Sequence, residues 1–203
     1  MWHHLDRASD TALNAGPSGH GEPVAVFETV AATAAEKRER RPGDELVPAA
    51  DVVMDRGFTV AGRPESVWPW IVQLGKRRAG WYLPRRVERL LPPSRRATRE
   101  IVRRWQQLGP GDVIPDYGGR HETFTVVTIE PPTTLVYRSR RGLIDVSWSI
   151  VLRPDGKQTR VLLRLRLGSV RRKWLAVTAG ELLDLLTIAG LAAGLRERLA
   201  SPS

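Results

Sequence analysis

The chain has 203 residues, enough for one domain with a sizeable core and an additional segment, and its 41% apolar and 27% charged residues are typical of a folded protein. It contains no cysteine, which excludes a disulfide framework, a thiolate metal site and a cysteine nucleophile. The net charge of +10 is regional, because residues 76–104 carry eleven Lys or Arg against two Glu, whereas residues 1–50 carry five basic and eight acidic side chains.

We expect residues 1–45 to form a partly disordered extension and residues 46–200 to form the folded domain. Gly, Pro and Ser interrupt "NAGPSGHGEP", and a short helix is expected between Phe27 and Arg40. No signal peptide is recognised, because "PVAVFETVAATAA" follows no basic region and contains Glu28. A cytoplasmic location is the resulting prediction.

The folded domain is expected to begin with a strand at residues 52–60, "VVMDRGFTV", followed directly by a helix in "PESVWPWIVQLG". Apolar residues recur there at helical spacing, and Gly75 ends the helix. Pro69 fits the first turn if Ser66 is the N-cap; alternatively the helix begins at Pro64 and is kinked at Pro69.

A second short helix is expected from Pro84 to Leu91, within the basic segment of residues 76–104. Its arginines could contact phosphate, nucleic acid or anionic lipid, but a solvated surface is the simpler interpretation. No helix-turn-helix, RNA-recognition strand pair or zinc finger accompanies them, so nucleic acid is not an expected partner.

Residues 112–168 alternate apolar and polar side chains and predict an antiparallel sheet. Two strands centred on Trp148 and Leu163 flank "RPDGKQ", whose Asp-Gly pair is typical of a hairpin turn. Residues 122–129 and 134–139, joined by "EPPT", predict another hairpin. With the first strand and a short strand near Val113, the sheet has about six strands.

The chain closes with a long helix, "WLAVTAGELLDLLTIAGLAAGLRERL", that is apolar on nearly every side. Its length approaches the ~20 residues of a membrane span. However, Glu181 and Asp184 lie near the middle, and an aspartate there costs about 2.5–3.5 kcal/mol on insertion. The sequence therefore favours a helix buried in the protein over a membrane anchor.

This order of elements predicts an α+β fold in which a curved antiparallel sheet of about six strands wraps around the long C-terminal helix, with two short helices after the first strand. A pocket is expected where the short helices close one end of the space between helix and sheet.

The order of elements, together with "PGDELVP", "PESVWPWIVQLG", "GWY" and "SWSIVLRP", resembles the SRPBCC or START-like superfamily. More closely, it is similar to actinobacterial members labelled polyketide cyclase/dehydrase and lipid transport. The resemblance covers residues 41–199 and implies the helix-grip fold and an apolar ligand cavity. It implies no particular reaction, because members of the superfamily include lipid carriers, hormone receptors and aromatases.

Aromatic and leucine side chains are the candidate ligand-binding residues. For any single aromatic residue an ordinary core or edge position is the better interpretation, whereas for the aromatic set, clustered around one predicted cavity mouth, the two interpretations carry equal weight. The candidates are Trp68, Trp81, Tyr82, Trp105, Tyr137, Trp148, Leu182 and Leu186.

Candidate catalytic groups are few, because the sequence contains no HExxH, GxSxG, P-loop or GxGxxG motif. A cyclase could use His121, Glu181 or Asp184 as its base and Tyr137 or Ser147 as a hydrogen-bond donor. Alternatively, Glu181 and Asp184 face solvent or pair with Arg138, Arg140 or the basic residues 171–173. No metal or other cofactor is expected.

Three functions therefore remain open. The first is binding or transport of a small hydrophobic molecule in an internal cavity, and the second is a cofactor-independent cyclase, aromatase or dehydratase acting in the same cavity. The third is a lipid-transfer protein that docks on anionic membrane through Arg85, Arg86 and Arg89.

Overall fold

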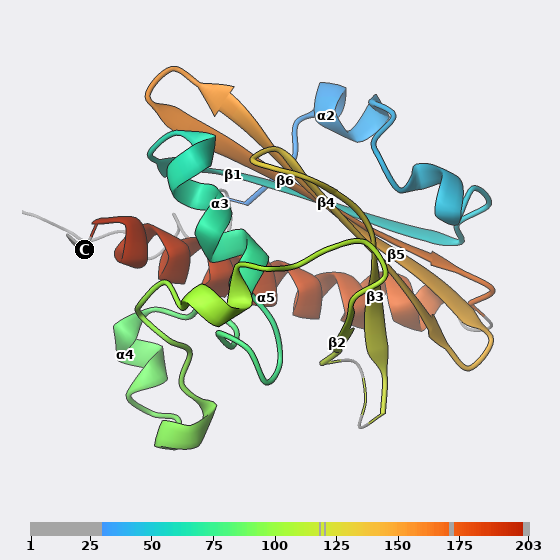
Figure 1. The fold of residues 1–203 in the computed structure, drawn as a ribbon. Helices are drawn as coiled ribbons and strands as arrows, with labels where there is room; N and C mark the ends of the chain where they lie inside the picture. Colours follow the sequence, from blue (N-terminus) through green and yellow to red (C-terminus); the bar gives the residue numbers. More distant parts are fainter. Residues whose placement is uncertain (1–29, 118, 120, 171–172, 201–203) are drawn as a thin grey trace, which may run out of the picture.

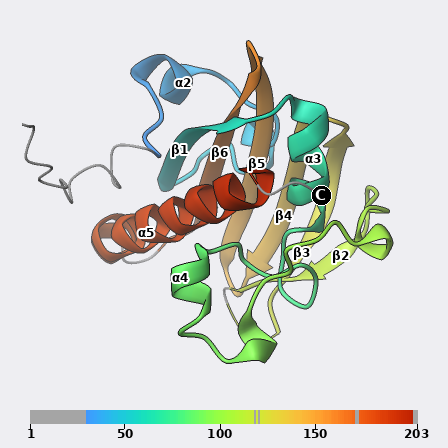
Figure 2. The same cartoon turned by 90° about the vertical axis from the view of Figure 1, so that its left-hand side faces the viewer.

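The computed structural model describes residues 30–117, 119, 121–170 and 173–200, with residues 173–179 described by their backbone alone. Within this part of the chain, six strands form one antiparallel sheet in the order β1-β6-β5-β4-β3-β2. Helices α3 and α5 lie on one face of the sheet, and α2 lies on the opposite face (Figure 1, Figure 2).

The strands are β1 Val52–Ala61, β2 Val113–Pro115, β3 Thr123–Glu130, β4 Thr134–Arg141, β5 Ile144–Asp155 and β6 Gln158–Gly168. The helices are α2 Ala34–Arg38, α3 Pro64–Gln73, α4 Arg85–Glu88 and α5 Lys173–Ala200, with single 3₁₀ turns η1 Asp44–Leu46, η2 Pro93–Arg95 and η3 Arg103–Trp105.

Both expected hairpins are confirmed: β3 pairs with β4, and β5 pairs with β6. Alternating side chains place one apolar face of each strand in the core. On β5 and β6, Ile150 pairs with Leu163, and both side chains are buried. Gly156 has a positive φ of 59° in the turn between these strands, a backbone conformation that glycine adopts readily. β1 pairs with β6 along its whole length, so the first and last strands lie side by side.

Helix α3 begins at Pro64, with Arg63 as its N-cap, so the assignment of Ser66 as N-cap is wrong. Pro64 suits the first helical position because the N–H it lacks would have no partner there. Pro69 consequently lies inside the helix. Three apolar side chains hold the helix on the core in spite of it: Val67, Trp70 and Ile71 are all buried.

Helix α4 is a single turn and is shorter than the expected Pro84–Leu91. Two apolar residues of the expected helix are not core residues, since Val87 of α4 is 42% exposed and Leu90, beyond its end, is 84% exposed. The buried side chain is Glu88, which accepts from Arg198 Nη2 of α5 at 2.7 Å and from Arg99 Nη2 at 2.8 Å. An ion-pair network, rather than apolar packing, therefore fixes α4 to α5.

Helix α5 is buried mainly in its C-terminal half, where Ile188, Leu191 and Leu195 contribute to the core. Gly194 permits close approach to the loop after α3, because a Cβ there would lie 2.6 Å from Leu83 N. Nearer the start of the helix, Leu183 is 67% exposed, so the expectation of burial on several sides fails there. Within the described part of the chain, no helix combines the length and apolarity that a membrane span requires.

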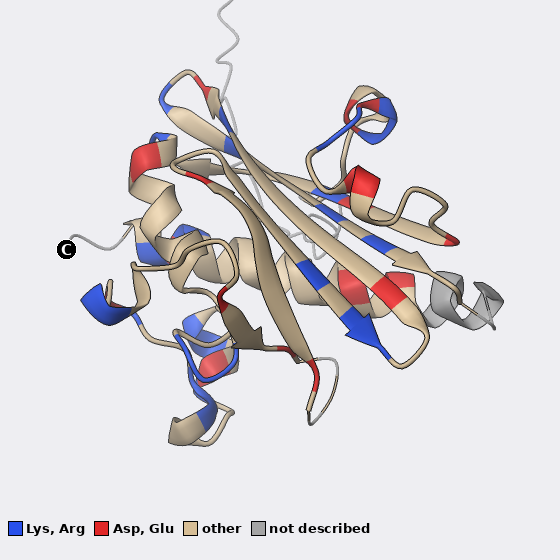
Figure 3. Ribbon diagram, turned by 45° about the vertical axis from the view of Figure 1, so that its right-hand side comes forward, with Lys and Arg blue, Asp and Glu red and all other residues tan. Residues whose placement is uncertain are grey.

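Residues 31–48 pack on the outer face of the sheet (Figure 3). Arg164 of β6 is 3% exposed, and its guanidinium donates to Asp55 Oδ1 at 2.7 Å and to Asp44 Oδ2 at 2.9 Å. It also donates to three main-chain carbonyl oxygens of residues 36–39. The short helix expected between residues 27 and 40 is thus observed as α2, while residues 1–29 of the expected extension lie outside the described residues.

Candidate functional site

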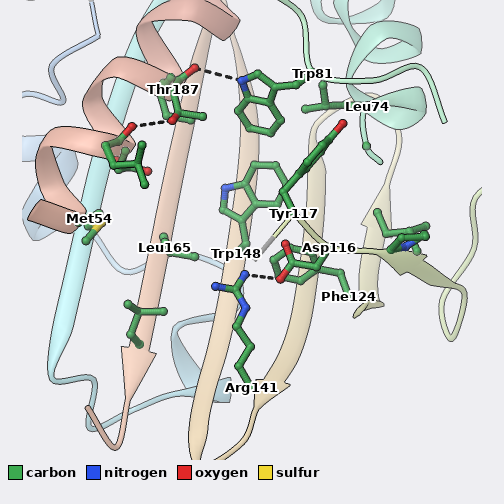
Figure 4. Close-up of a pocket in the computed structure, with 18 residues that line it drawn as sticks. Met54, Leu74, Trp81, Asp116, Tyr117, Phe124, Arg141, Trp148, Leu165 and Thr187 are labelled. Atoms are coloured by element: carbon green, nitrogen blue, oxygen red, sulfur yellow. Dashed lines mark hydrogen bonds and ion pairs between the residues drawn. The ribbon is translucent and has the colours of Figure 1, made fainter. Parts of the chain in front are cut away.

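A pocket of about 480 Å³ lies between α5, the inner face of the sheet and the loops that follow α3 and β2 (Figure 4). Its lining is mostly apolar and comes from every strand of the sheet. The lining residues are Met54, Leu74, Gly75, Trp81, Ile114, Pro115, Asp116, Tyr117, Phe124, Arg141, Trp148, Leu165, Leu167, Gly180, Leu183, Asp184, Thr187 and Ile188.

Aromatic rings gather around Trp148 on one wall of the pocket. Trp148 stacks on Trp81 with ring centroids 6.1 Å apart and on Tyr137 with centroids 5.6 Å apart. Phe124 lies 5.8 Å from Trp148, and Tyr117 meets Trp81 edge-on at 5.9 Å. Such a wall presents flat, polarisable surface to an apolar molecule.

Trp81 is positioned by a hydrogen bond to α5 and by the close-packed turn that precedes it. Its indole Nε1 donates to the Thr187 carbonyl oxygen of α5 at 3.1 Å. The preceding Gly80 has φ 88° and packs on Ala97, where a Cβ would lie 2.9 Å from Ala97 Cα. Glycine suits this turn, so Gly80 sets the backbone position from which the Trp81 side chain extends.

Two carboxylates line the pocket, and each is paired with an arginine. Asp116, at the end of β2, forms an ion pair with Arg141 at the end of β4. Asp184 of α5 pairs with Arg56 of β1, with Oδ2 and Nε 2.9 Å apart. Burial raises the pKa of Asp184, and the Arg56 guanidinium opposes that shift.

Of the six aromatic residues predicted to bind ligand, two line the pocket and four do not. Trp81 and Trp148 line the pocket, and Tyr137 lies behind Trp148 with burial raising its pKa. Tyr82 is fully buried and donates to the Trp70 carbonyl oxygen at 2.9 Å. Trp68 and Trp105 are partly buried against the core, away from the pocket lining.

The leucines proposed from α5 lie on a different side of the helix. Leu182 is 56% and Leu186 49% exposed, and neither lines the pocket. The lining positions on α5 are Gly180, Leu183, Asp184, Thr187 and Ile188. Because this helix is apolar nearly all round, its sequence carries no signal for which side meets the sheet.

The candidate catalytic residues are not brought together. His121 is exposed in the loop before β3, and Glu181 has a 58% exposed side chain. Ser147 alternates with the inward-facing Val146 and Trp148 and so lies on the outer face of the sheet. Asp184 lines the pocket, whereas Tyr137 does not.

Arg56, rather than the expected Arg138 or Arg140, pairs with Glu181 and Asp184, and the expected basic side chains of residues 171–173 lie outside the described part of the chain. Arg56 is 7% exposed, lies beneath α5 and also reaches Glu181 Oε1 at 3.8 Å. Among the described residues, no three His, Asp or Glu side chains form a group that could hold a metal ion.

Several lining residues were missed by reasoning from sequence. Met54, Leu165 and Leu167 could have been found, because they occupy the apolar positions of two predicted strands. Asp116 and Arg141 could not, since nothing in the local sequence indicates that the ends of β2 and β4 meet.

No family model matches the chain, and no curated protein matches it. Among solved structures, a hypothetical protein from Helicobacter pylori is similar over 78% of this chain and 94% of its own, at 14% identity and a TM-score of 0.51. CalU16 from Micromonospora echinospora is 14% identical over 72% of this chain and 83% of its own, with a TM-score of 0.44. Aha1 from Colwellia psychrerythraea is 13% identical over 72% and 98%, with a TM-score of 0.44.

At these identities, similarity to solved structures shows the fold alone. The chain has the helix-grip fold that its sequence predicts: a six-stranded antiparallel sheet packed against a long C-terminal helix.

Proposed function

We propose that the protein binds or carries a small hydrophobic molecule in the pocket between α5 and the sheet. One observation supports this above the others: about 480 Å³ of mostly apolar space is bordered by the stacked rings of Trp81 and Trp148. That volume lies within the roughly 300–1,000 Å³ typical of small-molecule sites. The proposal includes the cytoplasmic location expected from the sequence.

Native mass spectrometry of protein purified from its own host is the first test. A stoichiometric apolar molecule that is released on denaturation supports the proposal and identifies the cargo. Binding of the neutral dye Nile red then provides an assay for variants.

Adjacent residues of α5 offer a matched pair of variants. Thr187→Trp places an indole in the pocket, whereas Leu186→Trp adds the same group on the exposed side of the helix. We expect dye binding to be lost in Thr187→Trp and retained in Leu186→Trp. Equal binding by both folded variants would contradict the location of the site.

A second candidate function is cofactor-independent cyclisation, aromatisation or dehydration of a polyketide-like substrate. The observation that favours it is Asp184, a pocket-lining carboxylate whose pKa burial raises, as in general acids and bases. Turnover of a candidate substrate that is lost in Asp184→Asn, with substrate binding retained, supports catalysis. Unchanged turnover in Asp184→Asn would show that the Asp184 carboxylate is not the catalytic acid or base.

A peripheral membrane role is the third candidate, and the surface around α4 favours it. Leu90 is 84% exposed, and Arg85, Arg86 and Arg89 beside it are exposed as well. An exposed leucine could insert into the bilayer interface while the neighbouring arginines contact anionic lipid headgroups. Binding to phosphatidylcholine vesicles should require added phosphatidylglycerol, weaken with salt and disappear when the three arginines become glutamine.

A further inference from the structure

We infer that the pocket selects uncharged ligands and discriminates against molecules that carry an ionised carboxylate or phosphate. This inference rests on the proposed binding function and narrows its ligand class. It follows from the two arginines at the pocket, Arg141 and Arg56, because each is already paired with a carboxylate of the protein.

The first pair, Arg141 with Asp116, closes one side of the pocket (Figure 4). The Asp116 side chain is 5% exposed and that of Arg141 is 28% exposed. Arg141 also lies over the Phe124 ring, 5.6 Å from its centroid, and its Nε is buried without a hydrogen-bond partner among the described residues. Asp116 therefore supplies much of the compensation for this guanidinium charge.

The second pair lies beneath α5, on the β1 side of the pocket. Arg56 has a 9% exposed side chain and meets Asp184 at 2.9 Å and Glu181 at 3.8 Å. Its remaining donors reach the main-chain oxygens of Asp55 and Glu181, each at 3.1 Å. Two carboxylates thus already share this cation.

A further cation near the pocket is also engaged. Lys76 Nζ donates to the carbonyl oxygens of Asp116 and Gly119 at 3.0 and 2.9 Å, and Lys76 does not contribute to the lining. Its ammonium group is thereby directed at the loop between β2 and β3.

Each of these three described cations already has a partner, so an anionic ligand entering the pocket would lose water without gaining an unpaired counter-ion among them. To pair with Arg141 it would have to compete with Asp116, whose ion pair with that guanidinium is already formed and buried. An uncharged molecule of the same shape avoids this desolvation while burying the same apolar surface against Trp81 and Trp148. Charge state, rather than shape alone, should consequently decide which ligands bind.

Matched pairs of probes test this inference on the wild-type protein. Decanol is compared with decanoate, and 2-naphthalenemethanol with 2-naphthoate, at a pH well above the pKa of a carboxylic acid. Sufficient salt is added to screen the net charge of +10. We expect each neutral probe to bind at least about tenfold more tightly than its anionic counterpart, because an uncompensated buried charge costs more than 1.4 kcal/mol.

The outcomes separate the two proposals. Anions that bind as tightly as their neutral counterparts would overturn charge selection but leave the binding function intact. If no probe of either kind binds, and no cargo is retained through purification, both proposals fail.

A substitution that removes the carboxylate partner of a pocket arginine should increase the affinity for anionic probes. Asp116→Asn removes the carboxylate that holds Arg141, so the ratio of decanol to decanoate affinity should fall by roughly tenfold. Asp145→Asn is the matched control, because Asp145 pairs with the exposed Arg140 and lies outside the pocket lining. If Asp116→Asn does not fold, Asp184→Asn makes the same prediction for Arg56. An unchanged ratio in the variants that fold would overturn the assignment.

Discussion

One buried arginine makes five hydrogen bonds on the outer face of the sheet, and replacing it should be strongly destabilising. Arg164 is 3% exposed and donates to two carboxylates and three main-chain carbonyl groups. In Arg164→Met these acceptors lose their donor, and methionine supplies no replacement.

The size of the effect follows from what remains after the substitution. Removing one partner of a buried ion pair typically costs about 3–5 kcal/mol. Asp55 keeps Arg41 Nη1 at 3.4 Å, and Asp44 keeps Arg166 Nη1 at 3.5 Å, so the lower end of that range applies. With a urea dependence of about 2 kcal/mol per molar, the unfolding midpoint should fall by roughly 1.5 M.

Urea denaturation followed by tryptophan fluorescence measures this change. Arg138→Met, at an exposed position of β4, is the matched control and should shift the midpoint little. Hydrogen exchange should accelerate in residues 31–48 of the Arg164 variant, since these residues supply the acceptors. A loss below about 1 kcal/mol in Arg164→Met would refute the reasoning, because that is the effect of an ordinary surface substitution.

Three further predictions concern other parts of the fold. Gly194→Val should lower the unfolding free energy by at least about 2 kcal/mol in thermal or urea denaturation, because even its Cβ would lie 2.6 Å from backbone atoms of residues 82 and 83; wild-type stability would disprove the close approach. The hydrogen bond from Arg160 lowers the pKa of Glu36 from 4.5 to about 2, so its contribution to stability should be complete above about pH 4.5 and be lost as the pH falls towards 2. Glu36→Gln should flatten that part of the stability profile, and an unaltered acid limb would contradict the assignment. Leu90→Ser should change the unfolding free energy by less than about 0.5 kcal/mol, since Leu90 is 84% exposed, while weakening any binding to anionic vesicles.

Much of the fold follows from local sequence pattern. The alternation in β5 and β6 and the Asp-Gly turn between them determine a hairpin, because a strand exposes successive side chains to opposite faces. The length and apolarity of residues 173–200 similarly determine a long helix that needs a partner surface. An α+β architecture with a pocket could be inferred from these elements in order.

The local pattern is least informative where competing signals have similar strength. Pro64 and Ser66 are both suitable for the start of α3, and burial of Val67, Trp70 and Ile71 against the sheet decides for the longer helix. In α4 the apolar residues suggest a buried face, yet the pairing of Glu88 with Arg198 determines its orientation.

The candidate site shows the same division between sequence and tertiary structure. Trp81 and Trp148 could be proposed from sequence because they belong to a set of large aromatic residues expected near one predicted cavity mouth. The choice of Leu183 and Thr187 over Leu182 and Leu186 could not, because a helix that is apolar nearly all round has no preferred face until the sheet contacts it.

What the sequence determined by itself is the set of elements, since hydrophobic period and turn chemistry act over neighbouring residues. What only the tertiary structure decided is which charges meet. Arg56 and Asp184 lie 128 positions apart, as do Arg164 and the Glu36 carbonyl group. Ion pairs of this kind depend on packing between distant segments. The charges around the pocket are therefore set by the packing of α5 against the sheet and cannot be deduced from neighbouring residues in the sequence.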